Sequence, residues 1–152
     1  MGRDIHVRIV RKDYNENTWK EVVLYHKGYE KMEPVDIYPF RNYELFDILS
    51  GNEHDGYKAM PIIIDDLPDS IKQEIKEYQQ DYAFGFREIT LADLQLYLYK
   101  VPKIKDDEED ILKDNPVKFF IERITQYLDF VEPWWDECLL SSNIRILYWF
   151  DN

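Results

Sequence analysis

The chain has 152 residues, 45% of them hydrophobic and 16% aromatic, a formal net charge of −12 at pH 7 and one cysteine, Cys138. The apolar content excludes intrinsic disorder, a single cysteine excludes an internal disulfide and a cysteine-rich zinc site, and the negative charge disfavours direct nucleic-acid binding, which needs cationic side chains. We expect one globular domain, residues 1–152, in the cytoplasm, since no stretch approaches the about eighteen apolar residues of a membrane span.

The N-terminal residues predict a β-hairpin. Residues 4–12 alternate apolar and polar side chains, a period of two that is typical of a half-buried strand. Residues 13–17 are turn-forming types, and residues 18–26 are again rich in strand-favouring types.

Several helices are expected in the middle of the chain, because cap residues, apolar periodicity and helix-ending glycines or prolines recur there. The expected helices start at Asn42 and stop at Gly51, cover residues 69–80, start at Thr90 and end before Pro102, and start at Asn115 and end before Pro133. Asp65 and Asp66, which follow an isoleucine run, are interpreted as helix caps rather than as ligands of Mg²⁺.

The C-terminal residues 143–151 predict a strand that is apolar on both faces. Such a strand belongs in the middle of a sheet that is covered on both sides. We therefore expect an α+β fold with a small antiparallel sheet, made of the N-terminal hairpin plus the C-terminal strand, packed against several helices.

Four short segments resemble a family of phage and prophage proteins. The opening Gly2-Arg3-Asp4-Ile5-His6 resembles Gly-Cys-Asp-Ile-His, and the last nine residues, 144–152, resemble Val-Arg-Ile-Val-Phe-Trp-Phe-Asp-Asn. Residues 41–46 are similar to Arg-Asn-Tyr-Asp-Leu-Phe, and residues 90–94 to part of Leu-Thr-Leu-Glu-Glu-Leu. The resemblance implies a phage-encoded protein that works in the host cell.

The chain departs from this family at two places. Arg3 replaces the usual cysteine, and residues 84–88 replace a Gly-His-Ser-His-Ser segment, so both histidines are absent. The family has no established activity, and the missing cysteine and histidines remove the side chains with which thiol or metal chemistry would begin.

Asp4, His6 and Asp151 are the candidate catalytic residues. If the first and last strands pair antiparallel, these side chains meet at one sheet edge. Such a cluster binds a divalent metal or holds a histidine as a general base, and Arg41 nearby would bind a phosphate or carboxylate. This arrangement would suit a metal-assisted hydrolase acting on nucleotides. The alternative is that His6 is solvent-facing and Arg41 an ordinary surface cation.

The leading hypothesis is a protein that acts by binding. No Walker loop, dinucleotide fingerprint or nucleophile elbow is present, and we expect no cofactor and no bound metal. Residues 51–152 carry 11 Lys and Arg against 22 Asp and Glu, whereas residues 1–50 carry 8 against 9. An acidic surface suits a competitor for a basic groove, although acidity for solubility alone is the commoner case.

We therefore expect a phage accessory protein that inhibits a host defence component, an anti-CRISPR-like role. Its partner would be a host protein with a basic surface, such as a nucleic-acid-binding defence effector. The tryptophans Trp134 and Trp135 are expected to pack at the edge of the core or, if exposed, to anchor the partner. A phage structural or assembly component is a further alternative. The candidate acidic contacts are Asp106, Asp107, Glu108, Glu109 and Asp110.

Overall fold

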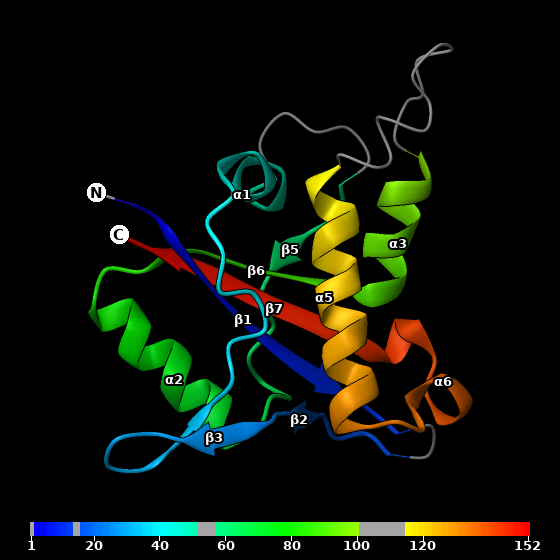
Figure 1. The fold of residues 1–152 in the computed structure, drawn as a ribbon, viewed down its shortest axis with the longest axis horizontal. Coiled ribbons are helices and arrows are strands. Elements are labelled where there is room, and N and C mark those ends of the chain that lie inside the picture. Colours follow the sequence, from blue (N-terminus) through cyan, green and yellow to red (C-terminus); the bar gives the residue numbers. More distant parts are fainter. Residues whose placement is uncertain (1, 14–15, 52–56, 101–114) are drawn as a thin grey trace.

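The computed structural model describes residues 2–13, 16–51, 57–100 and 115–152 (Figure 1). These residues form an antiparallel sheet and several helices, which confirms the predicted α+β fold. The strands are β1 (Asp4–Arg11), β2 (Lys20–Val22), β3 (Tyr25–Lys27), β4 (Met32–Pro34), β5 (Met60–Pro61), β6 (Phe84–Thr90) and β7 (Ile144–Asp151). The helices are α1 (Tyr43–Leu49), α2 (Asp69–Gln80), α3 (Leu91–Lys100), α5 (Pro116–Val131), α6 (Trp135–Cys138) and the short 3-10 helix Ser141–Asn143.

The main sheet is antiparallel and has the strand order β2-β1-β7-β6-β5. The expected pairing of the first and last strands is confirmed, since β1 runs along the whole of β7, from Asp4 opposite Asp151 to Arg11 opposite Ile144. The C-terminal strand lies in the middle of the sheet, as predicted. Strands β3 and β4 form a separate two-stranded sheet.

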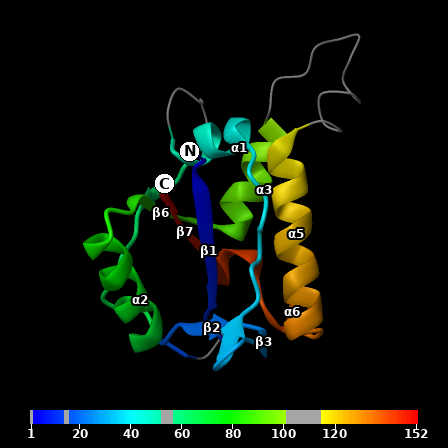
Figure 2. The ribbon, with the colours of Figure 1, turned by 60° about the vertical axis from the view of Figure 1, so that its left-hand side comes forward.

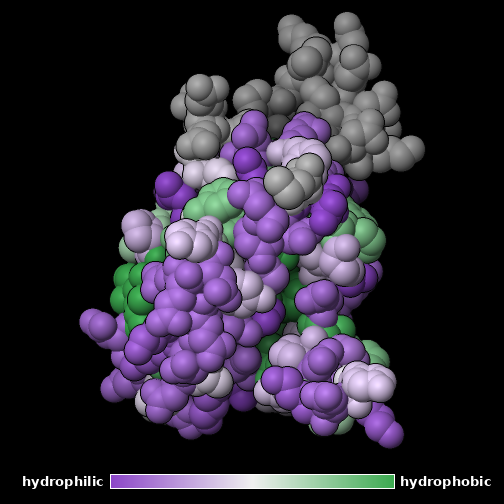
Figure 3. Space-filling model, turned by 90° about the vertical axis from the view of Figure 1, so that its left-hand side faces the viewer, coloured by the Kyte–Doolittle hydropathy of each residue, from purple (hydrophilic) through white to green (hydrophobic). Residues whose placement is uncertain are grey.

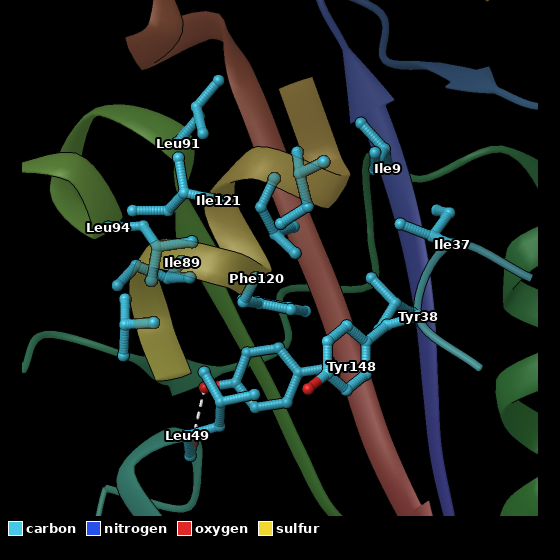
Figure 4. Close-up of a cluster of buried hydrophobic side chains, with 14 of the residues drawn as sticks. Ile9, Ile37, Tyr38, Leu49, Ile89, Leu91, Leu94, Phe120, Ile121 and Tyr148 are labelled. Carbon is cyan, nitrogen blue, oxygen red and sulfur yellow. Dashed lines mark hydrogen bonds between the residues drawn. The ribbon is translucent and has the colours of Figure 1, made fainter. Parts of the chain in front are cut away.

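The two faces of the sheet carry separate cores. Helices α1, α3 and α5 cover one face and α2 covers the other (Figure 2). Strand β7 alternates between them, because Tyr148 and Phe150 enter the larger core whereas Leu147 and Trp149 enter the core under α2. In the larger core the hydroxyl of Tyr148 donates to the carbonyl of Leu49 at 2.6 Å (Figure 4).

Three predicted helix starts are confirmed by their caps. The side chains of Asn42, Thr90 and Asn115 each accept a hydrogen bond from a backbone N–H two or three residues further on. These bonds satisfy donors that have no partner inside the helix. The helices therefore begin where the sequence places them. Within the residues that the structure describes, no helix has the length and apolar character needed to cross a membrane.

The interpretation of Asp65 and Asp66 as helix caps is wrong. Helix α2 begins after Pro68, which makes no side-chain capping bond. Instead Asp66 lies 3.0 Å from Nη1 of Arg145, a side chain on β7. The carboxylate compensates part of the charge that Arg145 brings under α2, because a buried guanidinium needs paired acceptors.

Strand β6 was not expected from the sequence. It contains Gly85, whose φ of +68° lies in the left-handed region, and its pairing with β7 shifts register between Phe84 and Arg87. It also contains Glu88, which is 5% exposed. A glycine and a buried glutamate are both depleted in strands, so the pattern is hidden in the sequence.

Candidate functional site

The structure brings His6 and Asp151 into direct contact. Asp151 lies opposite Asp4 in the β1–β7 pair, and His6 lies two residues further along the same face of β1. The Nε2 atom of His6 is 2.8 Å from Oδ2 of Asp151, so the ring donates to the carboxylate. Both side chains are partly shielded from solvent. The sequence-predicted edge cluster therefore exists as a His6–Asp151 pair.

Tyr78 of α2 is a third member of this cluster. Its hydroxyl lies 3.3 Å from Nδ1 of His6, and the two rings are 4.5 Å apart between centroids. Burial raises the pKa of Tyr78, and the carboxylate of Glu74 adds to this effect. Both ring nitrogens of His6 thus have a partner. The sequence places Tyr78 on the apolar stripe of its helix, but only the packing of α2 against β1 shows that it meets His6.

Asp4 faces Arg41 rather than His6. The Nε atom of Arg41, in the segment before α1, donates to Oδ1 of Asp4 at 2.7 Å. This hydrogen bond stabilises the carboxylate and lowers the pKa of Asp4, and the same contact raises the pKa of Arg41. A side chain at Gly2 would collide with the guanidinium, so the glycine leaves the space that Arg41 occupies.

A cleft of about 610 Å³ lies beside this cluster. One wall is the beginning of β1 and the other is the segment of residues 36–41, which leads from β4 towards α1. Figure 3 shows the face from which β1 is reached: hydrophilic side chains predominate, and apolar surface is visible in a hollow down its middle. The lining residues are Asp4, Ile5, His6, Asp36, Tyr38, Pro39, Phe40 and Arg41.

The hypothesis that this cluster binds a metal ion requires a set of ligands that the described residues do not provide. Among the described residues there is no group of three His, Cys, Asp or Glu side chains placed to hold a metal ion. Asp4 faces Arg41, so His6 and Asp151 are the two potential metal ligands that remain together in the described part of the cluster. Protein sites for divalent metals usually supply three or more ligands. The geometry therefore gives no support to a metal-assisted hydrolase.

The two tryptophans have different environments. Trp135 is 8% exposed, packs in the larger core and donates from Nε1 to Asp129, so the expectation of packing is confirmed for it. Its role as an exposed anchor is ruled out by this burial. Trp134 is 40% exposed, with the guanidinium of Arg11 over its ring at 5.1 Å. Only Trp134 presents surface to a partner.

The acidic run is outside the described residues. Asp106, Asp107, Glu108, Glu109 and Asp110 all belong to it, so the prediction that they contact a partner stays a prediction. Among the described residues, exposed carboxylates near the cleft include Asp36 on the segment opposite β1. That side chain makes no ion pair with the residues that the structure describes.

Comparison with known proteins gives no family for this chain. No protein-family model matches it, and neither a curated protein nor a solved structure matches it. Function must therefore be inferred from the cleft, the cluster beside it and the charge of the surface.

Proposed function

We propose that this protein acts by binding another protein, and that the cleft beside β1 belongs to the binding surface. The partner has a basic surface. In the setting that the resemblance implies, the protein is a phage-encoded accessory factor that inhibits a defence component in the cytoplasm of the host.

The observation that carries this proposal is the mutual pairing of the polar groups beside the cleft. His6 is engaged at both nitrogens, by Asp151 and Tyr78, and Asp4 is engaged by Arg41. These bonds fix the end of β7, helix α2 and the segment before α1 relative to β1. They therefore hold the shape of the cleft, and a preformed shape supports recognition of a partner.

The charge around the cleft supports a basic partner. Asp36 is exposed on one wall and makes no ion pair with the described residues, whereas Asp151 and Glu74, on the side of α2, are paired with His6 and Arg8. The whole chain carries a net charge of −12. Complementary potentials steer encounter and suppress wrong partners, so a basic surface would be favoured in the approach to this face.

The segments on which the resemblance rests give further support. Three of the four similar segments contribute to the cleft or to the cluster beside it, through residues 4–6, Arg41 and Asp151. A shared binding surface is a physical reason for these particular segments to look alike across a family.

The test is an affinity capture from host lysate at low and high salt, with the wild-type protein and two charge reversals. Asp36→Lys changes the cleft wall, and Glu30→Lys makes the same charge change on the exposed turn between β3 and β4. We expect one stoichiometric basic partner that is lost at high salt and with Asp36→Lys but kept with Glu30→Lys. A blank capture, or equal loss with both variants, would contradict the proposed function.

A further inference from the structure

The outer edge of β1 is only partly covered. Strand β2 pairs with the last three residues of β1, from Ile9 opposite Val22 to Arg11 opposite Lys20. From Asp4 to Arg8, no described strand pairs with β1 on that side. Figure 2 shows this part of β1 between α2 and the extended segment that leads to α1.

The direction of the backbone groups follows from the ladder between β1 and β7. The N–H of Lys12 donates to the carbonyl of Asn143 at 3.0 Å, which continues the β1–β7 register by one pair. In an antiparallel pair, alternate residues point their N–H and C=O groups to the same neighbour. The even-numbered residues of β1 therefore face β7, and Ile5 and Val7 face outward.

Three of the four outward backbone groups have no partner. The carbonyl of Val7 accepts a hydrogen bond from Nη1 of Arg8 at 2.8 Å. Within the described part of the chain, nothing bonds to the N–H of Val7 or to the N–H and C=O of Ile5. Ile5, which is 8% exposed, lines the cleft, whereas Val7 is 3% exposed and lies beyond its lining. Unpaired groups of this kind on a strand edge are the template for an added strand.

We propose that an extended segment of the partner protein adds to this free edge of β1 as a further strand. The inference rests on the proposed function and names the form of the partner. The three groups match about three residues of the added segment, which span about 10 Å. Main-chain bonds to Ile5 and Val7 provide affinity, and the side chains of the added strand provide specificity.

The added segment carries Lys or Arg at alternate positions. Its side chains point in turn towards the α2 side, where Asp151 lies, and towards the wall that contains Asp36, Tyr38 and Phe40. The second side offers the carboxylate of Asp36 and aromatic rings, whereas Asp151 is already bound to His6, so the basic residues of the segment face the wall that contains Asp36. A second copy of this chain is a poor occupant, because two chains that each carry a net charge of −12 repel each other.

The test uses peptides selected from a random library of extended peptides on the immobilised full-length protein. The best binder is then made in two N-methylated forms, one for each set of alternate residues, and in a form with Lys and Arg changed to Glu. We expect one N-methylated form and the Glu form to bind at least about tenfold more weakly, while the other N-methylated form binds normally.

Amide hydrogen exchange locates the peptide. The outward amides of Ile5 and Val7 should exchange faster in the free protein than the amides of β1 that pair with β7, and at least about tenfold more slowly once the peptide is bound. Ile5→Pro, which removes an outward donor, should weaken binding, whereas Ile5→Val should not. If Ile5→Pro does not fold, the exchange data decide.

Two results would overturn strand addition: no selected peptide, or a bound peptide that leaves exchange of Ile5 and Val7 unchanged. If host capture still returns a partner that Asp36→Lys loses, the proposed function stands and only its strand-addition form fails. If host capture is also blank, both fail. Self-association that protects the same two amides would mean that the edge is occupied by a second copy, which also overturns the proposal.

Discussion

The carboxylate of Asp151 lies 2.8 Å from Nε2 of His6, so the last residue of β7 is bound to a side chain near the start of β1. The same ring reaches Tyr78 on α2 through Nδ1. One histidine therefore joins the two central strands to the helix that covers one face of the sheet. The side chain of His6 is 20% exposed, so a substitution there should remove contacts that are largely shielded from solvent.

We expect His6→Ala to lower the free energy of unfolding by about 1 kcal/mol, because a partly buried hydrogen bond and the ring contact with Tyr78 are lost together. Urea denaturation measures this loss. His26→Ala on β3 is the control, since His26 is exposed, and it should change stability by less than about 0.5 kcal/mol. Equal losses in the two variants would show that the contacts of His6 do not contribute to stability.

The buried ion pair between Glu88 and Arg145 makes a second prediction. Both side chains are 7% exposed, and Nε of Arg145 lies 3.2 Å from Oε2 of Glu88. Arg145→Met leaves the Glu88 carboxylate buried without its partner, which should cost about 3 kcal/mol in unfolding free energy. Asp66→Asn should cost less than about 1 kcal/mol, because Asp66 is 45% exposed.

The double variant Arg145→Met with Glu88→Leu separates pairing from packing. We expect it to recover most of the lost stability, since neither buried charge remains. Chemical denaturation of the wild type, Arg145→Met, Glu88→Leu and the double variant gives the coupling energy. A double variant as unstable as Arg145→Met alone would mean that the contact of Arg145 with the Trp19 ring, 4.8 Å from its centroid, dominates instead.

Gly85 and Gly51 provide a third, matched prediction. Both have positive φ, +68° and +75°, but a methyl at Gly85 would lie 2.9 Å from the ring of Phe150, whereas one at Gly51 meets only the end of the Arg87 side chain at 3.4 Å. Gly51→Ala should cost about 1 kcal/mol from backbone strain alone, and Gly85→Ala more than about 2 kcal/mol. Thermal unfolding compares them. Equal losses would mean that Phe150 moves aside freely.

Stability should fall steeply above pH 10. Burial raises the pKa of several tyrosines above the ordinary value of 10.0, most strongly at Tyr57 and Tyr148, which share a hydrogen bond of 2.6 Å. Above pH 10 the unfolded chain loses these protons while the folded chain keeps them, so the folded state binds more protons and loses stability as the pH rises.

Urea midpoints between pH 8 and pH 11 measure the effect. Tyr148→Phe should reduce the decline above pH 10, because one such proton is removed from the balance. Tyr29→Phe is the control, since Tyr29 is fully exposed and should leave the decline unchanged. A decline that is the same in all three proteins would assign alkaline unfolding to other groups.

The periodicity of apolar residues and the helix-capping residues make most of the fold predictable from the sequence. The alternation in residues 4–12 and the apolar faces of residues 143–151 fix which side chains share a face, because a strand has a period of two. The antiparallel pairing of the two ends was a condition of the sequence analysis, and the structure fulfils it and brings His6 and Asp151 together. Cap residues determine the helix starts, since they satisfy donors locally.

What only the tertiary structure decided depends on contacts between distant segments. The ion pair with Arg145 makes Glu88 acceptable inside β6, and no local pattern announces such a pair. The docking of α2 brings Tyr78 to His6. The shortness of β2 leaves the edge of β1 at Ile5 free, because the length of a paired strand is set by where its neighbour turns away. Sequence periodicity shows which side chains share a face of a strand or helix, but only the packing of distant segments determines which residues those side chains contact.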